Sequence, residues 1–319
     1  MNGIEKLESD LSLYKYVSLN EYDLDNLRKG LLFLRTASFF NDKFDSAPYY
    51  SKAIFDEMLQ ENIDAGGLED LKKTYAMFDD DYRRRILSHI VKDAMDSSFQ
   101  DVGLVSCFSD NCQSNIMWAH YGDIYKGAIF EYSSSDLIKA AQDHLLDAKK
   151  KGLFNFKEEV IIKTPMLEKV AYMHERSDIT NELRRAKRQF DFFGVQEDFS
   201  DPYYKFVALH DEEYLRIMRK TYFHKACEWS YESEWRLVIP NYQKDRVIPK
   251  IDKGKTMLLP VKPKSVILGN CTPGSKIKEI VQICLENGIK MYGSGPNYFS
   301  KTDEITVESL RQDFINMFR

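Results

Sequence analysis

A short segment late in the chain concentrates ionisable and aromatic side chains beside an apolar run. Residues 237–239 predict a buried strand that ends at Pro240. Because side chains alternate between the two faces of a strand, we expect Glu232, Glu234 and Arg236 to share one face of this strand and of the residues leading into it. Charged groups are costly to bury and are rarely needed for folding alone. We therefore interpret this segment as one wall of a functional site.

The paired carboxylates of Glu232 and Glu234 favour general acid–base chemistry. One carboxylate would act as a general base while its neighbour orients a sugar hydroxyl. The two groups also repel each other unless a cation such as Arg236 or Lys15 compensates their charge. A structural ion-pair network around Arg236 is the alternative interpretation, and the sequence leaves it open.

A second group of polar and aromatic residues lies nearer the middle of the chain. Ser106 and Ser109 are at the end of a predicted strand, where ligand contacts often lie, and His120 follows beside Trp118 and Tyr121. The histidine could act as an acid, a base or a hydrogen-bond donor toward a ligand. It could equally be a buried histidine bonded to the backbone, so both interpretations stay open.

Lys15 stands between Tyr14 and Tyr16 on an early predicted strand, residues 13–17. A lysine flanked by tyrosines could bind a phosphate or a carboxylate. A charged side chain that points outward from an edge strand explains the same pattern.

A loop that contains Asn41, Asp42 and Asp45 could deliver an amide and carboxylates to a cleft, anchored by neighbouring phenylalanines. The alternative is a tight turn, because Asn and Asp side chains readily hydrogen-bond their own backbone.

Composition and missing motifs exclude several classes of protein. The 319 residues are 43% hydrophobic with a formal net charge of −5, so a packed core is expected and a generic nucleic-acid coat is not. We predict no membrane span and, because no signal-peptide pattern is present, a cytoplasmic protein. The 5 cysteines are odd in number and fit neither a disulfide framework nor a zinc motif, so we predict no metal. The Walker, Rossmann, nucleophile-elbow and zinc-protease signatures are absent.

The predicted helices and strands do not alternate regularly, which favours the α+β class over a doubly wound parallel sheet. We expect a single domain, 1–319, with a central mixed or antiparallel sheet surrounded by helices and with helical insertions at about 51–99 and 174–225. The charged stretch at 178–189 fits a solvated helix face or a polyanion site. Strands are expected at 13–17, 31–35, 103–108, 126–132, 160–163, 169–173, 265–268 and 289–292, and further helices at 21–29, 114–121, 136–151, 203–225, 275–287 and 307–318.

In their order along the chain, these motifs resemble a bacterial family catalogued as domain of unknown function 2971. The resemblance extends from about residue 11 to about residue 270. The matching motifs are Leu13-Tyr14-Lys15-Tyr16, Phe40-Asn41-Asp42-Lys43-Phe44-Asp45, Ser106-Cys107-Phe108-Ser109, Met117-Trp118-Ala119-His120-Tyr121, Lys126-Gly127 and Tyr231-Glu232-Ser233-Glu234-Trp235-Arg236.

A basic residue on the first strand, a serine-containing strand and a later Glu-x-Glu strand are similar in order to those of ADP-ribosyltransferases. That resemblance implies an ADP-ribosyltransferase-like fold, in which a split sheet holds NAD as the substrate. It implies catalytic roles for Glu234, assisted by Glu232, and we add His120 as an acid or base. The residues expected to bind NAD are Lys15, Tyr16, Ser106, Ser109, Trp118, Tyr121 and Arg236, with Asn41, Asp42 and Asp45 as loop contributors.

The first expected function is therefore an NAD-consuming ADP-ribosyltransferase or NAD glycohydrolase, serving as an antiphage-defence or toxin effector. It would take a small-molecule nucleotide and a protein or nucleic-acid acceptor. The second is a hydrolase or nuclease that holds a divalent metal with the carboxylates of the loop and of the Glu-x-Glu segment. The third is a non-catalytic module that binds a nucleotide or a partner protein through Trp118, Tyr121, Trp229 and Trp235.

Overall fold

The computed structural model describes residues 10–42, 44–151, 166–185, 211–241, 256–296, 305–310 and 312–317. It divides into two compact units. Unit 1 comprises Met1–Arg35, Val105–Val170 and Glu228–Arg319, and unit 2 comprises Thr36–Leu104 and Ala171–Cys227. The ranges 51–99 and 174–225, for which helical insertions are predicted, belong to unit 2.

A large sheet, almost wholly in unit 1, contains 10 of the described strands in the order β12–β11–β10–β4–β1–β3–β2–β9, while β8 pairs with both β3 and β5. β10 and β11 are parallel, and β4 is antiparallel to β1 and β10. The expected mixed sheet of an α+β protein is thus confirmed. The strands are β1 (Ser12–Val17), β2 (Leu31–Thr36), β3 (Gly103–Ser109), β4 (Ala128–Ser133), β5 (Met166–Lys169), β8 (Glu234–Pro240), β9 (Thr256–Pro260), β10 (Ser265–Leu268), β11 (Lys290–Pro296) and β12 (Ile305–Ser309).

Strand β1 lies between two groups of strands in this sheet. One group contains β4, β10, β11 and β12, and the other contains β3, β2, β9, β8 and β5. β1 pairs with β4 along its whole length, whereas its register with β3 sets Tyr14 opposite Ser109, at the end of β3. β3 in turn pairs with β2 and β8. Lys15, the next residue on β1, therefore lies beside the junction of the two groups.

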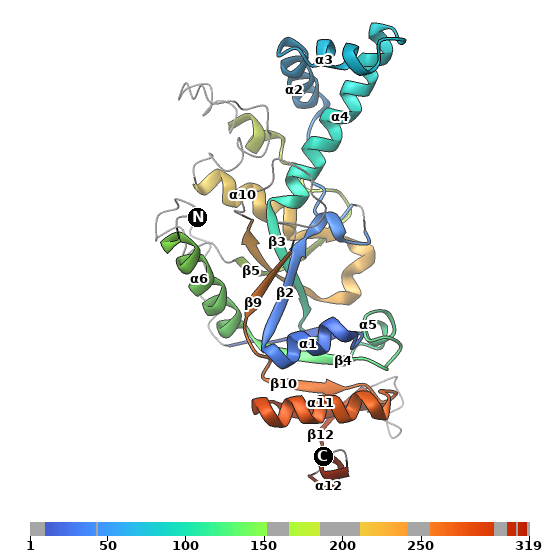
Figure 1. The fold of residues 1–319 in the computed structure, drawn as a ribbon, viewed down its shortest axis with the longest axis vertical. Helices are drawn as coiled ribbons and strands as arrows, with labels where there is room; N and C mark the ends of the chain where they lie inside the picture. The colour runs from blue at the N-terminus through green and yellow to red at the C-terminus, as the bar shows by residue number, and fades with distance from the viewer. Residues whose placement is uncertain are drawn as a thin grey trace. The chain divides into compact units, whose positions relative to one another are not determined.

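Two helices of unit 1, α1 (Glu21–Lys29) and α11 (Gly274–Asn287), contact each other, as Figure 1 illustrates. α1 begins with a capping box, in which the Asn20 side chain accepts from the backbone of Asp23, and it ends at Gly30 in the left-handed conformation. An ion pair of 2.8 Å between Arg28 and Glu279 joins the two helices at the surface.

Helix α6 (Ser134–Lys150) packs against β5, β8 and β9. Its buried apolar residues recur three or four positions apart, which places them on one face. That face packs against β8, the strand that begins at Glu234. The residues are Leu137, Ala141, Leu145 and Ala148. Unit 1 also contains α5 (Asn115–His120) and α12 (Gln312–Met317).

Unit 2 is mainly helical. Helices α2 (Lys52–Asp64) and α3 (Gly67–Thr74) both pack against the long helix α4 (Asp80–Asp101), as Figure 1 shows. The remaining described elements of unit 2 are the 3-10 segment Ala37–Phe39, α10 (Asp211–Tyr222) and the parallel strands β6 (Ala171–Met173) and β7 (His224–Ala226).

The helix predicted at 307–318 is wrong in its first part. Ile305 and Val307 belong to β12, where they lie opposite Pro296 and Ser294 of β11, and a helix starts only at Gln312. Alternating apolar residues that pair with a neighbouring strand have overridden the helical propensity. The strand predicted at 160–163, and the parts of other predictions at 186–189 and 203–210, lie outside the described residues.

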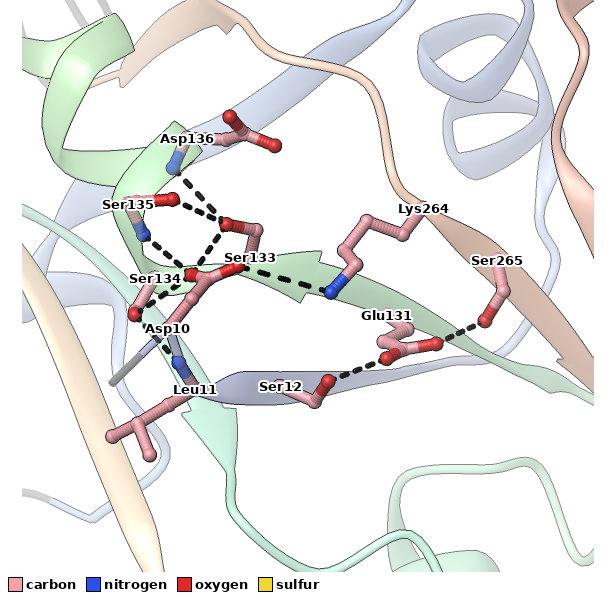
Figure 2. A network of polar contacts seen from close by, with 10 residues as sticks. All are labelled: Asp10, Leu11, Ser12, Glu131, Ser133, Ser134, Ser135, Asp136, Lys264 and Ser265. Atoms are coloured by element: carbon pink, nitrogen blue, oxygen red, sulfur yellow. Dashed lines mark hydrogen bonds and ion pairs between the residues drawn. The ribbon is translucent and has the colours of Figure 1, made fainter.

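The first turn of α6 is tied to Asp10 by hydrogen bonds, which Figure 2 shows from close by. Asp10 accepts from the Ser133 hydroxyl at 2.6 Å and from the Ser135 backbone N–H at 3.1 Å. These bonds lower the pKa of Asp10 from 3.8 to about 2, the Ser133 bond having the largest effect. Asp10 therefore serves as an additional N-terminal cap for α6.

Replacing Asp10 with asparagine should destabilise the protein by at most about 1 kcal/mol at pH 7, since solvent screens this half-exposed carboxylate. The folded-state pKa is depressed, so this stability is present above pH 3.8 and is lost as the pH falls toward about 2. Urea unfolding at pH 7 and pH 3 measures both effects, with Asp143→Asn on the same helix as the control. An equal loss in the two variants at pH 7 would contradict the capping role.

Candidate functional site

Glu234 and Arg236, two residues apart on β8, form a buried ion pair. Their exposed fractions are 3% and 0%. The Arg236 guanidinium donates from Nε to Oε1 of Glu234 at 2.7 Å and from Nη2 to Oε2 at 3.0 Å. This two-point contact fixes the plane of the carboxylate. Glu234 and Arg236 therefore form the structural ion pair that the sequence left open as an alternative.

Glu232 does not lie on the same strand as Glu234, contrary to the expectation from alternation. It ends a 3-10 helix, Cys227–Glu232, and Ser233 has a φ of +44° before β8 begins. The left-handed residue breaks the two-residue alternation, so a shared face does not follow. The Glu232 carboxylate instead accepts from the Tyr121 hydroxyl at 2.6 Å, while its backbone carbonyl accepts from the Ser109 hydroxyl at 2.7 Å.

Lys15 reaches across from β1 to β3. Its partly buried ammonium donates to the Ser106 hydroxyl at 2.9 Å and to the Cys107 carbonyl at 3.3 Å. Burial lowers the pKa of Lys15, while the carboxylates of Asp23 and Glu234 oppose that shift. The residues that the sequence marked at positions 15, 106 and 234 are therefore electrostatically connected within unit 1.

Cys107 follows Ser106 on β3, and in the sequence it was noted only as a member of the Ser106-Cys107-Phe108-Ser109 motif. Burial raises the pKa of its thiol, and the nearby Glu234 carboxylate raises it further. Its position next to Ser106, on the strand beside Lys15, was the available signal. Its backbone carbonyl accepts from the Lys15 ammonium, so Cys107 contacts this cation from the same strand as Ser106.

A row of rings, of which His120 is exposed and the others are half-buried, lies at the Glu232 end of the site. His120 ends α5, is exposed, and has its ring centroid 6.4 Å from that of Tyr121 and 6.0 Å from that of Tyr231. Tyr231 in turn lies 6.1 Å from Trp229. These rings offer apolar and aromatic surface beside a buried carboxylate, an arrangement that suits a flat heterocyclic ligand.

Trp118 and Tyr16 are placed elsewhere, in a cluster of buried residues. Trp118 is 0% exposed, its ring stacks on Tyr125 at 5.8 Å, and Tyr16 meets it edge-on at 5.4 Å. The Tyr16 hydroxyl donates to the Asn111 carbonyl at 2.8 Å. Both rings are thus engaged in packing, and we leave these two residues out of the proposed site.

The loop residues Asn41, Asp42 and Asp45 belong to unit 2. Asp42 accepts from the backbone N–H of Phe44 at 2.9 Å, which is the tight turn proposed as the alternative. Asp45 is buried and lies 3.5 Å from the ammonium of Lys225, within the same unit. The site of unit 1 is defined without these residues.

Metal ligands are not gathered anywhere in the part of the chain that the structure describes. No group of three or more His, Cys, Asp or Glu side chains there could hold a metal ion. The metal-dependent hydrolase therefore gains no geometric support. None of the described helices is long and apolar enough to span a bilayer.

Unit 1 is thus defined as an α+β framework whose mixed sheet carries a buried carboxylate–guanidinium pair, a partly buried ammonium and thiol near it, and partly exposed rings. Residues 117–237 match the family model described as a protein of unknown function (DUF2971), which supports the resemblance drawn from the motifs in that part of the chain. The matched range contains the motifs 117–121 and 231–236, whereas Lys15 and Ser106 precede it. Comparisons with curated proteins and with solved structures gave no significant match.

Proposed function

We propose that unit 1 cleaves the nicotinamide–ribose bond of NAD, as an ADP-ribosyltransferase or an NAD glycohydrolase. The observation that supports this most is the hydrogen bond between Lys15 and Ser106, 91 positions apart, in a cluster that also includes Glu234. A cation for phosphate, a serine from a central strand and a carboxylate are the groups that this chemistry requires.

The reaction would proceed through an oxocarbenium-like ribose. The glycosidic bond breaks with its electron pair leaving on nicotinamide, and water or an acceptor then bonds to the ribose carbon. The Glu234 carboxylate would stabilise the developing positive charge, and Arg236 would hold that carboxylate in one orientation. Lys15 would bind a phosphate oxygen, its attraction strengthened by partial burial.

The incoming nucleophile must lose a proton, and two groups near this row of rings are candidates to accept it. His120 is exposed and next to Tyr121, whose hydroxyl is bonded to the Glu232 carboxylate. Either the imidazole or that carboxylate would act as the general base. The rings of His120 and Tyr231 would flank the nicotinamide.

The direct test is nicotinamide release from NAD, measured chromatographically with and without cell lysate as a source of acceptors. Glu234→Gln should lower the rate by about 100-fold, because it removes the charge that stabilises the transition state. Glu279→Gln, an exposed carboxylate of unit 1, is the matched control and should leave the rate unchanged. Circular dichroism of each variant establishes that it is folded.

Lys15→Met is a second variant that keeps the proposal testable if Glu234→Gln does not fold. It should raise KM for NAD more than it lowers kcat, because the lysine is assigned to binding. Wild-type protein that is folded and releases no nicotinamide would rule out the proposal. So would full activity in Glu234→Gln.

A non-catalytic nucleotide-binding module is the second candidate function. It is favoured by the two-point contact with Arg236, which engages both oxygens of the Glu234 carboxylate. Saturable binding of NAD by calorimetry, with the NAD recovered intact after long incubation, would support this candidate over the first.

A further inference from the structure

We propose that Tyr121 is a catalytic residue that relays a proton from the incoming nucleophile to the Glu232 carboxylate. The inference rests on the proposed function and deepens it, because it selects this carboxylate, rather than the imidazole of His120, as the final proton acceptor. The resemblance drawn from the sequence gave Tyr121 a role in binding NAD, whereas the hydroxyl of this tyrosine has a carboxylate as its partner.

The Tyr121 hydroxyl and the Glu232 carboxylate form a short hydrogen bond. The hydroxyl donates to Oε1 at 2.6 Å. This distance lies within the range of about 2.5–2.7 Å that is typical of a hydroxyl donor and an ionised carboxylate. Glu232 is 3% exposed, whereas Tyr121 is half-buried. The phenol is therefore the member of the pair that a nucleophile from solvent reaches more readily.

The donor and the acceptor are attached to backbones that are each fixed by hydrogen bonds. Tyr121 follows α5, and its backbone N–H donates to the Met117 carbonyl at 2.8 Å. The Glu232 carbonyl accepts from the Ser109 hydroxyl at 2.7 Å, and the next carbonyl along the chain accepts from the backbone N–H of Asp110 at 3.2 Å. The short contact between the two side chains is thus supported from both sides, as a proton relay requires.

His120 is the other candidate base, and its imidazole is not oriented in this way. The side chain is exposed and contacts the rings of Tyr121 and Tyr231, with centroids 6.4 Å and 6.0 Å away. Within the described part of the chain, no hydrogen bond fixes its ring. A general base is effective when its position is fixed relative to the proton that it accepts. This comparison favours the carboxylate, and it leaves the imidazole to contact the ligand.

The proton moves in one concerted step. As the oxygen of the nucleophile bonds to the ribose carbon that nicotinamide leaves, its O–H bond breaks and that proton bonds to the Tyr121 oxygen. The original O–H bond of Tyr121 breaks at the same time, and its proton bonds to Oε1 of Glu232. Tyr121 ends the step neutral, and Glu232 ends it as a carboxylic acid that loses its proton to water before the next turnover. Glu234 keeps its charge throughout and stabilises the ribose cation.

Carbon-13 NMR tests the contact without reference to activity. In protein labelled at the Cζ atom of tyrosine, the Tyr121 signal is the one that is lost in Tyr121→Phe. It should shift in Glu232→Gln, because the hydroxyl then faces a neutral amide. Tyr125 is the internal control, since it is also half-buried and its hydroxyl donates to the Asn115 side-chain oxygen at 2.7 Å. The Tyr125 signal should stay in place, and a Tyr121 signal that also stays in place would overturn the inference.

Kinetics of nicotinamide release test the relay. Tyr121→Phe keeps the ring and should lower kcat about 100-fold with little change in KM, and Glu232→Gln should have the same effect. The double variant should lose no more than either single variant, because both substitutions interrupt one route. Tyr125→Phe is the matched control and should keep the wild-type kcat. Circular dichroism establishes that each variant is folded.

A proton inventory separates the relay from a structural role of the hydroxyl. Two protons move in the relay, so the single-turnover rate of the wild type should depend on the deuterium content of the solvent along a curve. Tyr121→Phe should give a straight line, and Glu232→Gln takes its place if that variant does not fold.

The outcomes distinguish the relay from the proposed function. If the wild type is active and Tyr121→Phe matches its kcat, or if the two losses add in the double variant, the relay fails and the proposed function stands. If folded wild type releases no nicotinamide while the Cζ shift is present, the proposed function and the relay both fail, and only the hydrogen bond remains.

Discussion

Arg236→Met is expected to destabilise the protein by about 3–5 kcal/mol, the range for removing one partner of a buried ion pair. Methionine matches much of the arginine side chain in length, so the loss is chiefly electrostatic. The Glu234 carboxylate, only 3% exposed, would lose both of its guanidinium contacts and remain in a site that water cannot reach. Urea unfolding followed by circular dichroism measures the change.

Two further variants distinguish the loss of the buried ion pair from the general effect of removing an arginine. Arg28→Met breaks the surface pair with Glu279, in which the side chains are 48% and 39% exposed, and should cost less than about 1 kcal/mol. The double variant Arg236→Met with Glu234→Leu removes both charges of this pair and should recover much of the stability. Equal losses in Arg28→Met and Arg236→Met would show that the buried pair is not coupled as the geometry implies.

Recovery in the double variant would also bear on function. A pair that apolar residues can replace is not required for folding, so its presence calls for another explanation. The proposed role of Glu234 in NAD cleavage supplies one, because a carboxylate held in a fixed orientation away from water exerts a strong field on a developing cation. The double variant would then recover stability without recovering nicotinamide release.

Elements with local signals were predictable from the sequence. Helix α1 has the predicted bounds because Asn20 caps its start and Gly30 adopts the left-handed conformation at its end. The strand at 265–268 was also predicted with its observed bounds, since four apolar or small residues between turns suit a fully buried strand. Such signals depend on neighbouring residues alone.

Features set by tertiary contacts were not predictable. Nothing in the type of Ser233 indicates its positive φ, which separates Glu232 from the face of Glu234. The approach of Lys15 to Ser106 and Glu234 depends on the meeting of three strands, and no spacing along the chain reveals that. The sequence could therefore indicate the Glu-x-Glu motif, but not that Glu232 contacts Tyr121 while Glu234 pairs with Arg236.

The turn that connects α5 to β4 is held by close backbone contacts around Gly127. The backbone N–H of Gly127 donates to the Gly122 carbonyl at 2.8 Å, and a Cβ at Gly127 would lie 2.0 Å from the Val17 carbonyl oxygen at the end of β1. Real Cβ atoms do not approach a backbone atom so closely. Neither strand end can move away without breaking the β1–β4 ladder, in which Val17 lies opposite Ala128.

Gly127→Ala should therefore destabilise the protein by about 3 kcal/mol or more, because backbone, and not a flexible side chain, must shift to admit the methyl group. Gly295→Ala in β11 is the control: no atom lies within 4 Å of the added Cβ, and the change should be within about 0.5 kcal/mol. Urea midpoints of the two variants measure the difference, and similar midpoints would contradict the close approach. Because β1 carries Lys15 and the turn follows His120, displacement of this junction should also reduce nicotinamide release in any Gly127→Ala protein that still folds.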